Sequence, residues 1–142
     1  MKWNWLLVMA TLGGAISALG CPPAPKQDYP VDELARVADL TEVMRVLAQT
    51  ADPWFGRRTD ASFADADYAQ MLTDADRVAA AARAAAGPAA GAQPAGFVDF
   101  AKALELRAGA WREAAKANDA PAVGTALEAV REQCRGCHSA YR

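Results

Sequence analysis

Histidine and cysteine are scarce in this chain, which has one histidine and three cysteines among 142 residues. A structural zinc site takes four Cys or His ligands, so such a site would need every one of them. The chain also lacks the alternation of apolar and polar residues that marks β-strands. Basic residues are in no excess, at 15 Lys and Arg against 17 Asp and Glu. These absences argue against a zinc domain, a β fold and a nucleic-acid-binding protein.

The single histidine directly follows two of the cysteines, in the run Cys134-Arg135-Gly136-Cys137-His138 near the end of the chain. C-x-x-C-H is the attachment signature of a c-type haem. The two thiols form thioether links to the porphyrin, and the imidazole becomes the proximal iron ligand. Positions i, i+3 and i+4 share one face of a helix, so Cys134, Cys137 and His138 would face the same flat group. The motif therefore predicts one covalently bound haem c.

Other interpretations of the two cysteines explain less. A zinc site would also need Cys21, which lies in a different context, described next. A thioredoxin-like C-x-x-C pair accompanies a βαβ pattern, which this sequence does not have. A plain disulfide between Cys134 and Cys137 would leave His138 unexplained. Haem attachment accounts for all three residues.

The first twenty residues read as a signal peptide. Lys2 is followed by eighteen uncharged residues and then by Cys21, the layout of a secretory leader. A retained membrane span is the alternative, since eighteen residues is close to the minimum length. Residues 18–21, Ala-Leu-Gly-Cys, resemble the bacterial lipoprotein processing box, although the family prefers leucine and alanine in the opposite order. This resemblance implies lipidation of Cys21, with simple secretion as the other outcome.

Residues 21–30 follow as a proline-rich linker, and residues 31–142 remain for one domain. The linker has prolines at four positions between residues 22 and 30, so it reads as an extended, semi-rigid spacer. Without the leader the chain has fourteen basic and seventeen acidic residues, a formal charge of −3. Every interpretation of the leader puts the domain outside the cytoplasm. We therefore expect a periplasmic protein, tethered to a membrane as a lipoprotein.

Prolines and glycines divide the domain into four helical segments, with breaks at residues 52–56, 87–96 and 118–121. Within each segment, apolar residues recur at spacings of three and four. Four helices joined by short loops predict an all-α, antiparallel up-down-up-down bundle with a cofactor in its core. We expect the tryptophans to fill that core. The four predicted apolar stripes are Val37, Leu40, Met44, Leu47 and Ala51; Tyr68, Leu72, Ala75, Ala79 and Ala82; Phe97, Phe100, Leu104, Ala108, Trp111 and Ala115; and Val123, Leu127, Val130, Cys134, Cys137 and Tyr141.

The second axial ligand of the iron cannot be another histidine, and methionine is the usual partner in electron-transfer haems. Outside the leader the methionines are Met44 and Met71. In an antiparallel bundle, the start of the first helix lies beside the end of the last. His138 is about 6 Å from the C-terminus at 1.5 Å per residue, and Met44 is about 8 Å from a helix start at Asp39. Residues 39–42, Asp-Leu-Thr-Glu, have the spacing of a capping box at that start. A start at Asp32 would put Met44 about 18 Å in and spoil the match. Met71, midway along the second segment, is the weaker candidate.

A C-terminal C-x-x-C-H-x-x-Y-R on the fourth helix of a bundle resembles the class II cytochromes c, the cytochrome c′ family, over roughly residues 31–142. The resemblance implies a four-helix bundle with covalent haem and a basic residue at the propionates, where Arg142 matches the motif. Arg135 and Arg45 are further candidates for that role. The low-spin branch uses a methionine early in the first helix, and residues 39–47 around Met44 are similar to that ligand segment. Counting four residues on from Arg36 instead places Leu40 opposite the iron, as in the five-coordinate branch.

Taken together, these features predict a small tethered electron carrier with His/Met-ligated haem, exchanging electrons with membrane or periplasmic redox proteins. The alternative is a five-coordinate cytochrome c′ that binds nitric oxide or carbon monoxide. An enzyme is not expected, because no paired carboxylates or nucleophile–base pair accompany the proposed site. Related bundles often form dimers, so a homodimer is one expected assembly.

Overall fold

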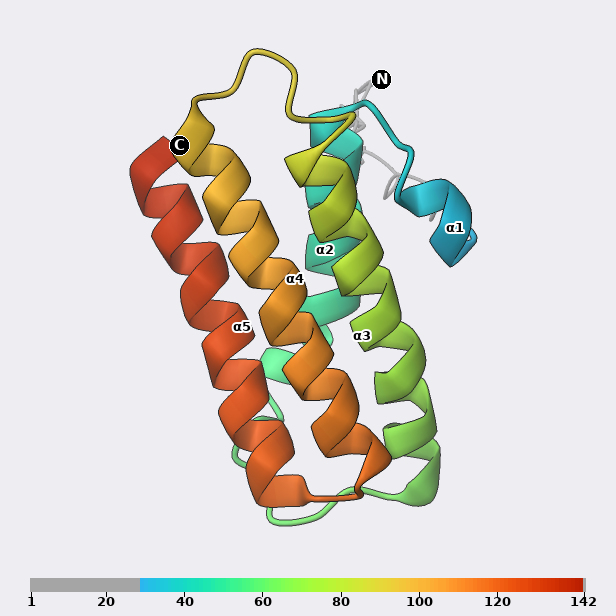
Figure 1. Ribbon diagram of the computed structural model, residues 1–142. Helices are drawn as coiled ribbons and strands as arrows, with labels where there is room; N and C mark the ends of the chain where they lie inside the picture. Colours follow the sequence, from blue (N-terminus) through green and yellow to red (C-terminus); the bar gives the residue numbers. More distant parts are fainter. Residues whose placement is uncertain (1–28, 142) are drawn as a thin grey trace, which may run out of the picture.

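Five helices and no strands make up residues 29–141, the part of the chain that this computed structural model describes. They are α1 (Val31–Leu34), α2 (Leu40–Phe55), α3 (Asp65–Ala86), α4 (Ala95–Lys116) and α5 (Ala120–Tyr141). The four long helices run alternately up and down, with the start of α2 and the end of α5 at the same end of the bundle (Figure 1). The predicted all-α four-helix bundle is confirmed, with α1 as a short addition. The predicted leader, Cys21 and Arg142 lie outside the described residues.

The start of α2 settles the register of the first long helix. The Asp39 carboxylate accepts hydrogen bonds from the backbone N–H groups of Thr41 at 2.9 Å and Glu42 at 3.4 Å, as an N-cap does. Glu42 does not complete the predicted capping box but turns to Arg45, whose Nε donates to it at 2.8 Å. Because α1 and α2 are separate helices, Met44 lies five residues beyond the cap, as the later of the two predicted starts requires.

The other helix boundaries follow from special residues. α2 runs through Pro53 and ends in the predicted segment, at Phe55. α3 stops before Gly87-Pro88. Between α4 and α5 the backbone turns at Asn118, whose φ of 53° is left-handed, a conformation that asparagine tolerates better than most residues. The Asp119 carboxylate then accepts from the backbone N–H of Ala122 at 3.0 Å and caps α5.

The core lies mainly between α3 and α4, which pack against each other most extensively. A run of fully buried alanines in α3, residues 80–82 and 84–85, permits this close approach. Trp111 of α4 is completely buried and meets Trp54 of α2 edge-to-face, with ring centroids 6.3 Å apart. The prediction that these tryptophans fill the core is confirmed, because both are buried. Such a pair adds about 0.5–1.5 kcal/mol beyond the burial of area.

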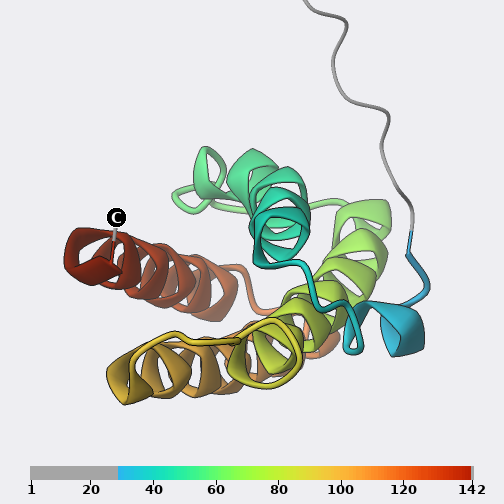
Figure 2. The same cartoon turned by 90° about the horizontal axis from the view of Figure 1, so that it is seen from above.

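α2 is attached to the bundle on one side only. It packs on α3 but makes few contacts with α5, and the view from above shows α2 standing off from α5 (Figure 2). Val43, Val46 and Leu47 of α2 are buried in the hydrophobic core. α2 is therefore held mainly by α3.

α5 approaches the loop after α2 closely at Gly124. A Cβ at this position would overlap the backbone carbonyl oxygen of Arg58, in the loop that follows α2. Arg58 also forms an ion pair with Glu128 of α5 and donates to the carbonyl of Phe55 at 2.6 Å. The lower end of α2 is thus linked to α5 through this loop.

Substituting Gly124 by alanine is expected to destabilise the domain by about 1–3 kcal/mol, because backbone atoms must move apart to make room. The matched control is Gly109→Ala in α4, where nothing lies within 4 Å of the added Cβ. There alanine should stabilise the helix by roughly 0.5–1 kcal/mol. Urea denaturation of both variants measures the difference, and equal effects at the two positions would contradict the close approach.

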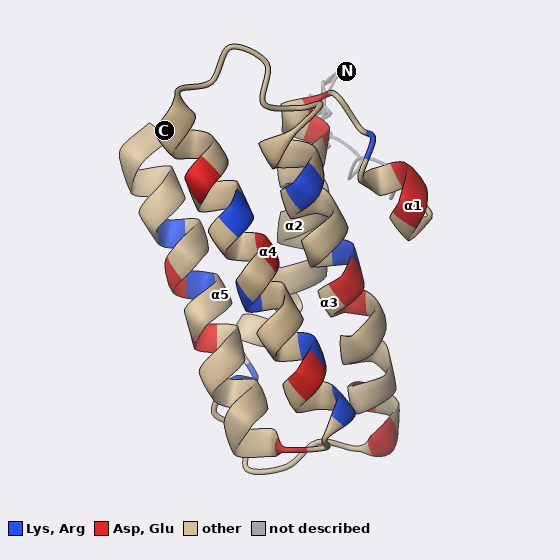
Figure 3. Cartoon of the chain, viewed as in Figure 1, with Lys and Arg blue, Asp and Glu red and all other residues tan. Residues whose placement is uncertain are grey.

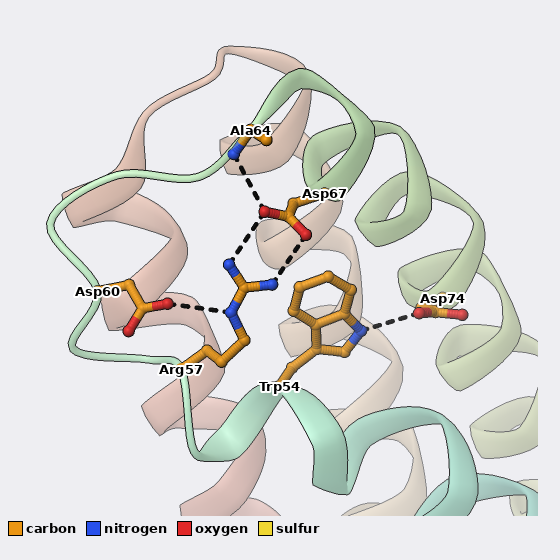
Figure 4. A network of polar contacts seen from close by, with 6 residues as sticks. All are labelled: Trp54, Arg57, Asp60, Ala64, Asp67 and Asp74. Atoms are coloured by element: carbon orange, nitrogen blue, oxygen red, sulfur yellow. Dashed lines mark hydrogen bonds and ion pairs between the residues drawn. The ribbon is translucent and has the colours of Figure 1, made fainter.

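A polar network fastens the loop after α2 to α3 (Figure 4). Arg57 donates two hydrogen bonds to the Asp67 carboxylate, at 2.8 and 3.0 Å, and one to Asp60 at 3.0 Å. Its guanidinium lies 5.4 Å from the centroid of the Trp54 ring, and the Trp54 indole N–H donates to Asp74 at 2.8 Å. The bidentate geometry makes the Arg57–Asp67 pair the most directional contact of the network.

The Asp67 carboxylate should make folding pH-dependent. Hydrogen bonds from Arg57 and from the Ala64 backbone lower the Asp67 pKa from 3.8 to about 2. Because the folded pKa lies below the unfolded one, this contribution is present above roughly pH 4 and is lost as the pH falls towards 2. The variant Asp67→Asn should therefore unfold at a lower urea concentration than the wild type at pH 6. This difference in urea midpoint should shrink below roughly pH 4. A difference that stays constant with pH would contradict this linkage.

Charged residues of both signs alternate along the outer faces of α3, α4 and α5 (Figure 3). Several of them form ion pairs, such as Arg83 with Glu105 at 2.9 Å between α3 and α4. Among the described residues, no helix combines the length and the apolar character that a bilayer crossing requires.

Candidate functional site

A cavity of about 410 Å³ lies between α2 and α5, with α4 behind it. Its walls are mainly apolar, formed by residues such as Leu47, Phe55, Phe97, Phe100 and Leu104. The volume is within the range of ligand-binding pockets, and such pockets combine apolar walls with a few placed polar groups. The open side of α2 described above is therefore one wall of a binding cavity.

α5 brings the whole C-x-x-C-H motif to this cavity. The helix is continuous from Ala120 to Tyr141, and Cys134, Cys137 and His138 all line the cavity wall. The two cysteines form no disulfide with each other, and both are partly buried. The helical spacing that the sequence predicted thus presents two thiols and one imidazole to a single space.

A second cavity, of about 320 Å³, adjoins the first at the top of the bundle. Met44, Phe97, Cys137 and His138 line both cavities, and Leu40 lines only the second. The two candidate distal residues, Met44 and Leu40, therefore lie one turn apart on the same side of α2. His138 borders both spaces.

The cavity lining keeps the two thiols uncharged at neutral pH. Burial, followed by the nearby Asp52 carboxylate and the neighbouring Cys137, raises the pKa of the Cys134 thiol to about 11. Burial also raises the pKa of Cys137. Reactive thiolates and thiolate metal ligands occur in electropositive surroundings that lower their pKa, which is the opposite environment. These surroundings are therefore not those of a redox-active or metal-binding thiolate pair.

Contacts with α4 fix the rotation of α5 at the motif. The Gln133 side-chain amide donates to the backbone carbonyl of Phe100 at 3.0 Å and accepts from Arg107 at 3.0 Å. Gly136, inside the motif, faces the same phenylalanine, since a Cβ there would lie 3.1 Å from the Phe100 ring. These contacts press one side of α5 against α4, so the side that bears the two thiols faces the cavity.

The two candidate methionines occupy different surroundings. Met44 is partly buried and lines both cavities. Met71 is completely buried in α3 as part of the core and does not border the cavities. Their assignment as ligand and non-ligand stays a prediction.

The arginines predicted for the propionates are likewise separated by the structure. Arg135 lines the main cavity. Arg45 instead forms an ion pair with Glu42 and donates to Gln49 at 2.7 Å. Arg131, which the sequence analysis did not single out, also lines the cavity, although it pairs with Glu128 at 3.2 Å.

These residues fit a covalently bound haem. Two cysteines and a histidine share one helix face, and the space they border is apolar and large. The sequence model of the cytochrome c′ family matches residues 8–142. The chain belongs to the cytochrome c′ family. Membership identifies it as a c-type haem cytochrome with covalently bound haem c, from a family whose members are typically periplasmic. No curated protein and no solved structure gives a significant match.

Some residues of this cytochrome c′ site had little signal in the sequence. Gln133 and Arg131 are polar residues beside an apolar stripe, and only their neighbours in space make them part of the site. The position of Gln133 directly before the motif was the available hint. Its link to Arg107 depends on the packing of α5 on α4.

Proposed function

We propose that this cytochrome transfers single electrons through a haem whose iron is held by His138 and Met44. The supporting observation is that Met44, among the methionines of the described residues, shares a cavity wall with Cys134, Cys137 and His138. Methionine and histidine together are the ligands typical of electron-carrying haems, and the thioether favours a higher reduction potential.

The chain's own residues define the chemistry of the site. Bound haem supplies the Fe(III)/Fe(II) couple, through which one electron enters and leaves. Cys134 and Cys137 would anchor the group covalently, and His138 of α5 and Met44 of α2, which line the same cavities, would hold its iron. The surrounding phenylalanines and leucines exclude water, which disfavours the more highly charged oxidised site and raises the potential further. No substrate or proton is required, so we infer that the protein is not an enzyme.

Redox proteins of the membrane or periplasm are the proposed partners. Lipidation at Cys21, outside the described residues, would tether the domain through the proline-rich linker. A tether raises the effective concentration of partners in the same membrane. Assembly as a homodimer is part of the proposal and is checked by the sedimentation behaviour of the haem-loaded domain.

Gas binding is the second candidate, because Leu40 borders the second cavity together with His138. If Met44 does not ligate the iron, this cavity of about 320 Å³ offers room for a diatomic gas. Nitric oxide or carbon monoxide would then bind on the side opposite His138, beside the leucine.

Optical spectra of the haem-loaded protein, oxidised and reduced, with and without carbon monoxide, test the two candidates. Electron transfer through His138 and Met44 predicts a low-spin spectrum, a methionine–iron charge-transfer band when oxidised, and no response to carbon monoxide. A high-spin spectrum that shifts with carbon monoxide would reject this ligation and support gas binding.

A further inference from the structure

A cluster of polar side chains grips the first turns of α2 on the side away from the main cavity. Tyr29, in the segment before α1, shares a side-chain hydrogen bond with Glu42. The Glu42 carboxylate also forms an ion pair with Arg45, and both side chains are only about one-fifth exposed, at 17% and 22%. Arg45 continues the cluster to Gln49 at 2.7 Å. We call Tyr29, Glu42 and Arg45 the strap cluster.

The strap cluster joins three parts of the chain. The carbonyl of Tyr29 accepts a hydrogen bond from Arg77 of α3 at 2.9 Å, so the segment that carries Tyr29 is fixed to the core of the bundle. Leu34 of α1, completely buried, anchors the same segment a few residues later. Tyr29 therefore bonds to Glu42 from a segment that is fixed by α1 and α3, independently of α5.

This support acts at the upper end of α2, where the Met44 side of the helix borders the cavities. The ion pair of Arg58 with Glu128 links the chain to α5 only beyond the opposite end of α2. At the upper end, Val43 and Val46 bury one side of α2, and the Met44 side borders the cavities. Apolar contacts fix the depth of a helix well but its rotation less well, because they are not directional. Hydrogen bonds at Glu42 are directional, and Glu42 lies two residues from Met44.

We propose that the strap cluster positions Met44, holding the upper half of α2 in the rotation that directs this side chain into the cavities that His138 also lines. Tyr29 and Glu42 are thus positioning residues, which never touch the haem and act through the helix. The inference rests on the proposed ligation by Met44. It implies that the segment before α1, which carries Tyr29, influences the equilibrium between six-coordinate iron and five-coordinate iron that can bind a gas.

The test compares Tyr29→Phe with the wild type, both loaded with haem. The substitution keeps the aromatic ring and removes the hydroxyl that bonds to Glu42. One hydrogen bond of ordinary strength corresponds to a roughly tenfold change in an equilibrium. We expect the ratio of methionine-bound to methionine-free iron to fall by about that factor. The charge-transfer band should weaken, and carbon monoxide should bind to a fraction of the protein that excludes it in the wild type.

Two further variants separate positioning from general stability. Tyr68→Phe removes a hydroxyl from a buried tyrosine of α3 that takes no part in the strap cluster, and its spectra should match the wild type. Asp32→Asn breaks an ion pair with Arg36 that is about three-quarters exposed, and it should also leave the spectra unchanged. Urea denaturation of each variant confirms that the spectra are recorded on folded protein.

The outcomes distinguish the positioning role of the strap cluster from the ligation of iron by Met44. A wild type with the charge-transfer band and a Tyr29→Phe variant with the same band would overturn the positioning role alone. A wild type without the band would overturn ligation by Met44, and the positioning role with it. A weaker band and partial carbon monoxide binding in Tyr29→Phe, but not in Tyr68→Phe or Asp32→Asn, support the proposal.

Discussion

Replacing Met44 by leucine is expected to convert the iron from low-spin to almost entirely high-spin and to make it bind carbon monoxide. Leucine has a similar volume but no sulfur, so the cavity stays filled on the α2 side while the iron loses a ligand. If the methionine-free form rises from about one per cent of the protein to nearly all of it, the apparent affinity for the gas rises roughly a hundredfold. The reduction potential should fall at the same time, because the thioether no longer favours Fe(II).

Optical spectra, a carbon monoxide titration and a potentiometric titration measure these three changes. Met71→Leu is the matched control, because Met71 is completely buried in α3 and does not border the cavities. It should keep the wild-type spectra while changing stability by less than about 1.5 kcal/mol. A Met44→Leu variant that remains low-spin and indifferent to carbon monoxide would show that another group holds the iron.

A variant with Cys134→Ser and Cys137→Ser is expected to lose covalent haem and, with it, the order of α2. Without the porphyrin, the apolar side chains around the cavity of about 410 Å³ lose a packing partner and are exposed to water, which is unfavourable. α2 is the helix free to move in response, because it makes few contacts with α5.

Hydrogen exchange of the double variant and of the haem-loaded wild type locates the change. Amides of α2 should exchange at least about a hundredfold faster in the variant, since their opening free energy falls by several kcal/mol. Amides in the middle of α3 and α4 serve as the internal control, because these two helices pack against each other extensively. Uniformly faster exchange in all four helices would contradict a local role for α2.

The helices and their boundaries could be read from the sequence because each depends on neighbouring residues. Asp39 caps α2 through backbone groups two and three residues away. Gly87 and Asn118 end α3 and α4 through their own backbone preferences. The haem motif is also local, since Cys134, Cys137 and His138 need only a continuous helix to share a face.

Long-range contacts of the site could not be read in this way. Glu42 looked like part of a capping box, but its carboxylate is held by Arg45 and by Tyr29, thirteen residues earlier in the chain. Arg45, a candidate for the propionates, is committed to that same cluster. A pattern within one helix does not reveal which distant side chain competes for a polar group.

The sequence by itself determined the cofactor chemistry, the number of long helices and their order, because these follow from a short motif and from the periodicity of apolar residues. Only the tertiary structure decided which helix stands apart. The small alanines of α3 let α3 and α4 pack closely, which leaves α2 with few contacts to α5. At Gly124, below the cavity, α5 closely approaches the loop that follows α2. Packing distances between helices depend on all the side chains that meet there, so the place of the cavity is a property of the assembled bundle.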